Sequence, residues 1–166
     1  MSKKGKKQKK SVENSNQRTI AENRKARHKY NVLETLECGI VLAGSEVKSL
    51  RNGNLSLDES YGRVRNNELW LIGADIPEYV EANFMNHQPK RPRKLLLHRN
   101  ELKKFAMQAH EKGLTLVPLK MYFKDGRAKL LMGLCRGKKL HDKRDSLKAA
   151  DSKRHIDREM KARMNR

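Results

Sequence analysis

The sequence is poor in cysteine and has no clustered metal ligands. Its two cysteines, Cys38 and Cys135, are far apart and form no CxxC pair. The six histidines are scattered, without the paired spacing of a zinc site. Two such cysteines in a cytosolic protein are most simply small buried hydrophobic residues. We therefore expect neither a structural metal nor a cofactor.

Long apolar runs are also missing, and none approaches the length that spans a bilayer. The opening residues Met1-Ser2-Lys3-Lys4-Gly5 are not followed by the apolar stretch of a secretory signal. Ser2 stands where N-myristoylation requires glycine. We expect a cytoplasmic protein without a membrane partner.

Catalytic signatures are absent as well: the sequence has no GxxxxGK[ST], GxGxxG or GxSxG motif. Glu34 with Glu37, or Asp58 with Glu59, could form a carboxylate pair, but neither pair has a histidine or glycine-rich loop beside it in the sequence. Surface charge or structural pairing explains these acids better. We expect no enzyme and keep a nuclease using Glu34 and Glu37 as a weaker alternative.

Acidic residues are scarce relative to basic ones, with 19 Asp and Glu against 39 Lys and Arg and a formal net charge of +20. Residues 1–19 and 136–166 carry the densest positive charge. A compact chain with this excess repels itself and favours a polyanionic partner, most commonly the phosphates of a nucleic acid. A charged surface that serves only solubility is the competing interpretation, but glutamate would then be expected to accompany lysine.

The apolar residues divide the chain into three parts. Residues 1–19 have almost none and are predicted to be a disordered basic arm. Residues 20–136 are predicted to form the folded core, with order beginning near Ile20. Residues 137–166 form a basic tail in which Ile156, Met160 and Met164 recur every four residues. That spacing predicts an amphipathic helix that is marginal alone, so we expect a tail that is disordered when free.

Turn residues predict two β-hairpins. Residues 57–65 and 68–72 flank Asn66-Asn67, and residues 115–123 and 128–135 flank a turn that contains Asp125-Gly126. Pro118 indicates an edge strand or a strand start. Residues 30–37 and 39–42 are further strand candidates.

Two helices are predicted between these strands. Ser45 can cap a short helix that ends at Asn52-Gly53. Residues 100–112 have apolar side chains at helical spacing and are followed by Gly113. The result is a mainly β fold with five or six short strands and a few helices. A small antiparallel OB-like barrel closes such a sheet with few elements.

Three basic stretches could bind RNA: residues 23–30, 90–94 and 136–144. The first adds His28 and Tyr30, which could stack on unpaired bases. The second is a loop stiffened by prolines, and the third follows the last strand. Each could equally be a solvated surface segment, and charge density alone does not decide between these interpretations.

Eight collinear segments resemble the bacterial SsrA-binding protein family, which binds transfer-messenger RNA. They span nearly all of residues 20–144, which makes the match far more specific than any single motif. The segments are NRKARH (23–28), ECGIVL (37–42), GSEVKSLR (44–51), DESY (58–61), NHQP (86–89), RKLLLH (93–98), GLTLVPL (113–119) and GKKLHDKR (137–144).

The resemblance implies an OB-like barrel of about six strands and three helices. It implies binding to the tRNA-like domain of transfer-messenger RNA and its delivery to stalled ribosomes for trans-translation. The tail would become helical in the decoding centre and the empty mRNA channel. We expect a monomer, and we keep a constitutive ribosomal or ribosome-assembly protein as the alternative.

The resemblance also implies site residues. Those that would contact transfer-messenger RNA are Asn23, Arg24, Lys25, Arg27, His28, Glu37, Leu96, Lys120 and Lys129. Those that would contact the decoding centre are Lys138, Lys139, His141, Asp142, Lys143 and Arg144. His98 departs from the family pattern, because some members carry Asn at this position.

Overall fold

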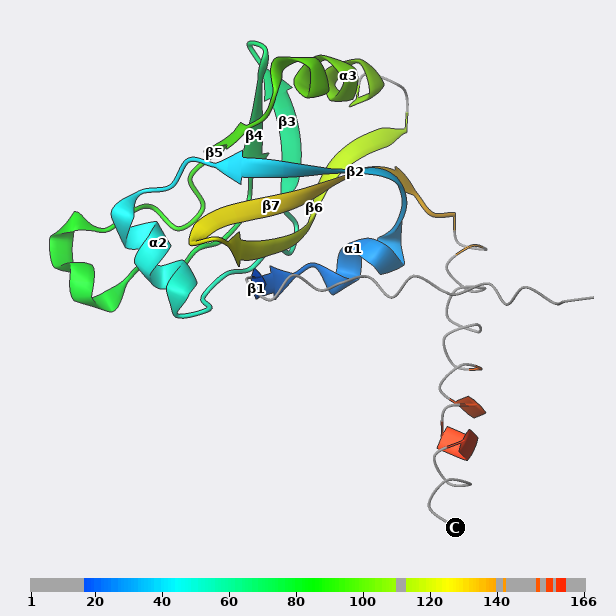
Figure 1. Cartoon of the computed structure of the whole chain (residues 1–166), viewed down its shortest axis with the longest axis horizontal. Helices are drawn as coiled ribbons and strands as arrows, with labels where there is room; N and C mark the ends of the chain where they lie inside the picture. The colour runs from blue at the N-terminus through cyan, green and yellow to red at the C-terminus, as the bar shows by residue number, and fades with distance from the viewer. Residues whose placement is uncertain are drawn as a thin grey trace, which may run out of the picture.

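The structure is a computed structural model that describes residues 17–109, 113–139, 142, 152, 155, 156 and 158–160. These residues form a curved antiparallel sheet with three α-helices and one 3-10 helix, η1 (Figure 1). The strands are β1 (Gln17–Glu22), β2 (Tyr30–Ile40), β3 (Tyr61–Arg65), β4 (Glu68–Ile72), β5 (Arg93–Leu96), β6 (Leu114–Lys124) and β7 (Arg127–Gly137). The helices are α1 (Arg24–Lys29), α2 (Gly44–Arg51), η1 (Val80–Met85) and α3 (Arg99–Ala109).

The sheet closes on itself. Its strand order is β1-β6-β3-β4-β5-β2-β7, and β7 also pairs with β6. Six strands therefore form a ring, while β1 pairs with β6 outside it. This ring confirms the expected small antiparallel barrel, and closure removes the exposed edges of its six strands.

Strand β1 is an element that the sequence did not predict. It begins at Gln17, three residues before the expected start of order at Ile20. Pairing with β6 sets its position, since Gln17 lies opposite Lys124 and Glu22 lies opposite Lys120. The strand is mostly polar, so its own apolar pattern gives almost no signal.

Both predicted hairpins are confirmed. Asn66 and Asn67 have φ angles of 51° and 55°, and Asp125 and Gly126 have φ angles of 50° and 74°. Two consecutive residues with positive φ match the right-handed twist of the flanking strands. The first hairpin is shorter than predicted, because the chain turns at Glu59 (φ 63°) and β3 begins only at Tyr61.

The expectation that Pro118 marks an edge or a strand start is wrong. Pro118 lies in the middle of β6, where the register against β7 shifts between Pro118 and Lys120. A bulge of this kind tolerates a residue without an N–H group inside a sheet.

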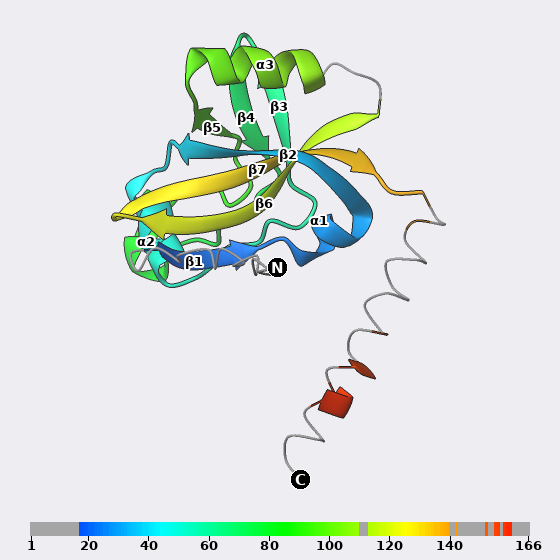
Figure 2. The same ribbon diagram turned by 45° about the vertical axis from the view of Figure 1, so that its right-hand side comes forward.

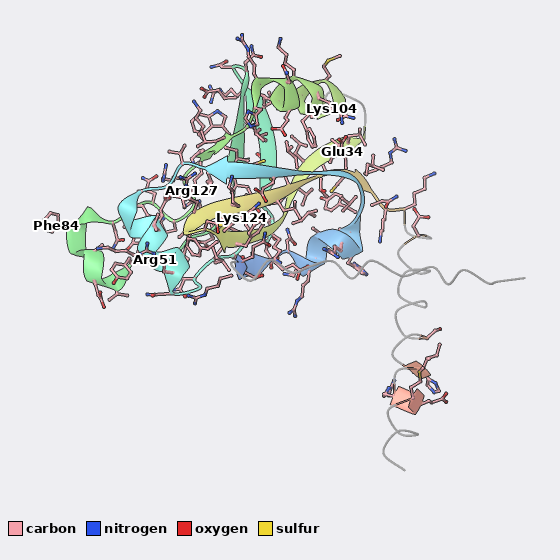
Figure 3. All side chains as sticks on the ribbon, viewed as in Figure 1. Glu34, Arg51, Phe84, Lys104, Lys124 and Arg127 are labelled. Carbon is pink, nitrogen blue, oxygen red and sulfur yellow. The ribbon has the colours of Figure 1, made fainter. Side chains whose placement is uncertain are left out.

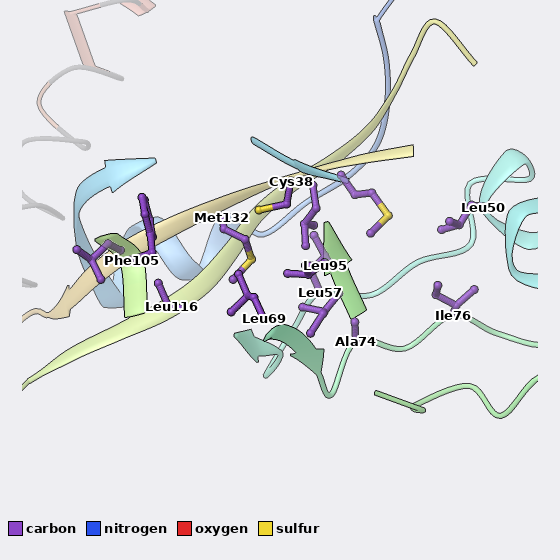
Figure 4. Close-up of a cluster of buried hydrophobic side chains, with 14 residues drawn as sticks. Cys38, Leu50, Leu57, Leu69, Ala74, Ile76, Leu95, Phe105, Leu116 and Met132 are labelled. Carbon is purple, nitrogen blue, oxygen red and sulfur yellow. The ribbon is translucent and has the colours of Figure 1, made fainter. Parts of the chain in front are cut away.

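The core fills the barrel and continues under its helices. Met132, Leu116 and Leu69 lie within the barrel, and Phe105 from α3 closes one end (Figure 4). Helix α3 lies across this end, as Figure 2 shows. Cys38 and Cys135 are both fully buried and unpaired, as predicted.

Two of the cations in the basic loop at residues 90–94, Arg91 and Arg93, are tied to the inside of the protein, whereas Lys90 is exposed, so RNA binding by the loop as a whole stays a prediction. The Glu46 carboxylate accepts hydrogen bonds from Arg91 Nε at 2.7 Å and from Arg93 Nε at 2.8 Å. Arg93 is 0% exposed and also donates to the backbone carbonyl of Ala74 at 2.6 Å. The single Glu46 carboxylate therefore pairs with both guanidinium groups, and both are hydrogen-bonded within the protein.

Helix α2 begins at Gly44 rather than after a Ser45 cap. Glu46 accepts a hydrogen bond from the Ala43 N–H at 2.6 Å and so satisfies the helix start. Ser45 instead contacts His87 Nδ1 at 2.9 Å. None of the helices in the described ranges combines the length and apolar character needed to cross a membrane.

Candidate nucleic-acid interface

Strands β2, β7 and β6 carry the candidate interface on their outer face. Inward-facing residues of these strands, such as Cys38, Leu130 and Met121, belong to the core. Side chains alternate along a strand, so the neighbouring positions Glu37, Lys129 and Lys120 face outward. Figure 1 shows β1 and α1 continuing this curved face beyond β6.

Asn23 holds α1 in position at one end of this face. Its Oδ1 accepts a hydrogen bond from the Ala26 N–H at 2.9 Å, which caps the helix. Its Nδ2 donates to the carbonyl of Leu57 at 3.0 Å, and its backbone N–H donates to the carbonyl of Leu119 at 2.8 Å. Asn23 is 5% exposed, so the structure gives it a positioning role, and its contact with RNA stays a prediction.

The charged side chains of α1 are exposed. Lys25 pairs with Asp58 at 2.6 Å, and Arg27 lies 3.6 Å from Glu22. Within the described part of the chain, no carboxylate pairs with Arg24 or Lys29. Exposed ion pairs contribute at most about 1 kcal/mol, so phosphate oxygens can replace the two carboxylates at low cost.

The root of the C-terminal tail lies beside α1. The Lys138 N–H donates to the carbonyl of Lys29 at 3.0 Å, and Lys138 Nζ donates to the carbonyl of Arg27 at 3.1 Å. The Lys139 N–H donates to Asp142 Oδ2 at 3.1 Å. The predicted residue Lys138 thus joins the surface of α1, and Lys139 follows it along the chain.

Three of the predicted tail positions, His141, Lys143 and Arg144, lie outside the described residues, so their contacts stay predictions. Among the described tail residues, 142, 152, 155, 156 and 158–160 have helical backbone.

Glu37 is the centre of a second cluster on the same face. Its carboxylate accepts a hydrogen bond from the hydroxyl of Tyr122, and it lies 3.5 Å from Lys124 Nζ and 3.7 Å from Lys129 Nζ. The Tyr122 hydrogen bond, aided by the two lysines, lowers the pKa of Glu37 below its ordinary value despite partial burial. Burial and the Glu37 carboxylate together raise the pKa of Tyr122. At neutral pH the site therefore holds an ionised acceptor beside cations.

Lys120 and Leu96 border this second cluster. Lys120 Nζ lies 5.8 Å from the ring centre of Tyr122, over its face. Leu96 is 50% exposed and packs close to Gly39, the strand neighbour of Lys129. Leu96, His98, Glu37 and Lys129 line one shallow hollow, so a ligand in it would meet apolar and charged groups together.

The predicted residues therefore form two groups joined by Lys120. The α1 group lies near Tyr30, and the Glu37 group lies near Gly39, nine residues or roughly 30 Å of strand length along β2. Lys120 pairs with Glu22, two residues before the start of α1, and also with Leu131, the strand partner of Glu37. The whole surface matches a long, folded polyanion better than a small ligand.

Tyr122 and Lys124 are parts of the site that the sequence did not predict. They follow Lys120 at intervals of two residues on β6, which places all three side chains on one face. That alternation was a usable signal. Their contact with Glu37 depends on the pairing of three strands and has no local signal.

The alternative nuclease pair does not form a joint site. Glu34 binds Lys104 of α3 and accepts a bond from Gln108 at 3.4 Å, whereas Glu37 faces Tyr122 and two lysines (Figure 3 labels Glu34, Lys104 and Lys124). In the ranges that the structure covers, no three His, Cys, Asp or Glu side chains are placed to hold a metal ion.

Comparison with known proteins places this geometry in a family. The model of the SmpB protein family matches residues 20–162. An SsrA-binding protein of Rhodopirellula baltica is 56% identical over 143 residues, which cover 86% of this chain and 81% of the relative. An SsrA-binding protein of Nitrobacter hamburgensis is 54% identical over 147 residues, which cover 88% and 94%.

A solved structure gives the same result. A chain described under "tmRNA-SmpB: a journey to the center of the bacterial ribosome" aligns with a TM-score of 0.64 and 47% identity. The alignment covers 76% of this chain and 93% of that chain. Sequence and fold agree over most of the molecule, and the chain therefore belongs to the SmpB protein family.

Proposed function

We propose that this protein binds the tRNA-like domain of transfer-messenger RNA and delivers it to stalled ribosomes for trans-translation. The observation that carries the proposal is the continuous outer face that joins the cations of α1 to the Glu37 cluster through Lys120. The membership of the chain in a family of SsrA-binding proteins names the RNA.

The two groups on this face would do different work. Arg24, Lys25 and Arg27 would bind phosphates and fix the orientation of the RNA. Glu37 would accept a hydrogen bond from a base or a ribose hydroxyl, which a cation cannot do. The Glu37 carboxylate, held by Tyr122 and two lysines, can recognise a hydrogen-bond donor at a fixed position. Such recognition favours one folded RNA over RNA in general.

The tail would act on the ribosome. Its root at Lys138 and Lys139 lies beside α1, so RNA bound to α1 and the start of the tail would be neighbours. His141 would stack on a base of the decoding centre, accompanied by Asp142, Lys143 and Arg144. Charged hydrogen bonds to rRNA would then replace the missing codon–anticodon pairing.

The proposed protein is a monomeric RNA-binding factor without catalytic activity. Its action on the ribosome places it in the cytoplasm. Its effect on chemistry is indirect, since it positions an RNA that other components aminoacylate and translate.

A reconstituted tagging reaction tests the proposal. Ribosomes stalled on mRNA without a stop codon, supplied with transfer-messenger RNA and this protein, should add the tag to the nascent peptide. A chain lacking residues 141–166 should still bind transfer-messenger RNA but should give no tagging. Full tagging by the shortened chain would contradict the role assigned to the tail.

A further inference from the structure

An apolar projection lies outside the RNA-binding face. Val80 and Phe84 of η1 are 93% and 86% exposed, the two highest values among the large apolar residues of the described chain. Figure 3 shows Phe84 at the outer end of the loop, pointing away from the barrel. The projection contributes nothing to the core clusters, and adjacent exposed apolar side chains of this kind often mark an interaction site.

The same segment is acidic in a chain with a net charge of +20. Residues 73–86 contain Asp75, Glu78 and Glu81 but no lysine or arginine. Glu78 and Glu81 are exposed beside Val80. The hydroxyl of Tyr79 donates to the Glu81 carboxylate, and Lys48 Nζ lies 5.5 Å from the Tyr79 ring centre. RNA phosphates would be repelled by this surface, whereas a basic protein would be attracted.

Both ends of the segment are firmly attached to the rest of the protein. Asn86 accepts a hydrogen bond from the Tyr79 N–H at 3.0 Å and donates one to the Tyr79 carbonyl at 2.9 Å, which closes the loop at its base. Ser49 of α2 donates to the carbonyl of Pro77 at 2.7 Å. The buried His87 contacts the Ile76 carbonyl at 2.9 Å. A projection fixed in this way loses little conformational entropy on binding.

We propose that Val80 and Phe84, with Glu78 and Glu81 around them, form a docking surface for a basic protein of the ribosome. The inference rests on the proposed function for the choice of partner. Proteins that bind rRNA are themselves basic, so they offer lysine and arginine to the two glutamates. An apolar hollow on such a protein would receive Phe84, the kind of aromatic anchor that dominates binding energy at interfaces.

Site-specific photocrosslinking identifies what covers Phe84. A benzophenone amino acid replaces Phe84 in the full chain, which is assembled with transfer-messenger RNA on stalled ribosomes and irradiated. The expected product is a crosslink to one basic ribosomal protein. The same amino acid in place of Met107, which is 75% exposed on α3, is the control and should not give that crosslink. A crosslink from position 84 to RNA, or none at all, would overturn the inference.

Two substitutions test the chemistry. Phe84→Ala should lower the affinity of the complex for stalled ribosomes about 10-fold, as loss of an interface anchor does. Glu78→Lys should also weaken it if the partner is basic, but should strengthen it if the loop meets RNA. Met107→Ala serves as the exposed apolar control. Unchanged affinity in Phe84→Ala, or tighter binding in Glu78→Lys, would refute a basic protein partner.

The affinity for free transfer-messenger RNA separates this inference from the proposed function. Both variants should bind this RNA within about twofold of the unmodified chain, because the loop lies off the RNA-binding face. If the unmodified chain failed to bind the RNA, the proposed function would fail. If the unmodified chain binds the RNA but Phe84→Ala leaves the affinity for stalled ribosomes unchanged, only the proposed docking surface would be wrong.

Discussion

The hydroxyl of Tyr122 on β6 donates a hydrogen bond to the carboxylate of Glu37 on β2, across the intervening strand β7. The bond fixes the acceptor of Glu37 between two lysines and keeps it ionised. This arrangement explains how a glutamate can lie on a surface that binds a polyanion. The nearby lysines offset its negative charge, and its oxygens can still accept a hydrogen bond from a base or a ribose hydroxyl.

Removing this acceptor should weaken recognition of transfer-messenger RNA. Glu37→Gln removes the charge and replaces one acceptor oxygen by an NH₂ donor, and should cost about 1–3 kcal/mol of binding, or roughly 5- to 150-fold in affinity. Glu34→Gln on the same strand is the matched control, because Glu34 faces Lys104. Titration by fluorescence anisotropy measures both. Equal losses in the two variants would refute a specific role for Glu37.

The cations of α1 should govern the salt dependence of binding. The double substitution Arg24→Ala and Lys29→Ala should lower the slope of log K against log salt by about 1 to 2, since each lost phosphate contact removes about 0.7 to 0.9. Binding at several salt concentrations gives the slope. Arg99→Ala with Lys103→Ala removes two exposed charges from α3 and should leave the slope unchanged. A lower slope in the α3 control, with an unchanged slope in the α1 variant, would show that the RNA binds at α3 instead of α1.

Barrel closure should depend on Gly62. This residue pairs with Leu116 to join β3 to β6, and a Cβ at Gly62 would lie 2.6 Å from Met132 Cε and 2.9 Å from Leu116 Cβ. Gly62→Ala should therefore lower the free energy of unfolding by about 1–3 kcal/mol through overpacking. Gly44→Ala, where a Cβ meets nothing within 4 Å, should not destabilise. Urea denaturation compares them, and an equally stable Gly62 variant would refute the close contact.

The buried Glu46 should be among the most sensitive charged positions. Burial raises the pKa of this carboxyl, but hydrogen bonds from Arg91, the Ala43 N–H and Arg93 outweigh burial and leave the pKa below its ordinary value. Glu46→Gln leaves buried guanidinium charge without its partner, and should cost about 3–5 kcal/mol at pH 7. Glu68→Gln, which breaks the partly exposed pair with Lys94, should cost less than about 1 kcal/mol.

The pH dependence of this effect has a defined sign. A folded-state pKa below the unfolded value means that the ionised Glu46 stabilises the fold above about pH 4.3. This contribution is lost as the pH falls through the folded-state pKa. The difference in stability between the unmodified chain and Glu46→Gln should therefore shrink below that pH. A difference that grows on acidification would contradict the proposed charge state.

Local chemistry determined which parts of the fold were predictable. The turns at Asn66-Asn67 and Asp125-Gly126 need residues that tolerate positive φ, and the sequence supplies them at those positions. The stripe on α3 follows helical periodicity, and Phe105 is buried as it indicates. These patterns involve only a few neighbouring residues, so the turns and the helix can be predicted without knowledge of the tertiary structure.

Other features depended on distant parts of the chain. Strand β1 is ordered by pairing with β6, a hundred residues later, and Arg93 is buried because Glu46 lies beneath it. Both were misjudged from composition alone: β1 has few apolar residues, and Arg93 lies in a basic loop. The contact between Tyr122 and Glu37 could not be predicted either, because it depends on the order of strands β2, β7 and β6 in the sheet.

Competition between RNAs in a mobility-shift assay tests the central claim most directly. The full chain bound to labelled transfer-messenger RNA is challenged with unlabelled transfer RNA at fixed salt. We predict that the complex persists at a hundredfold excess of transfer RNA and is displaced by unlabelled transfer-messenger RNA. Equal displacement by both RNAs would show that this face does not distinguish transfer-messenger RNA from transfer RNA and would contradict the proposed recognition.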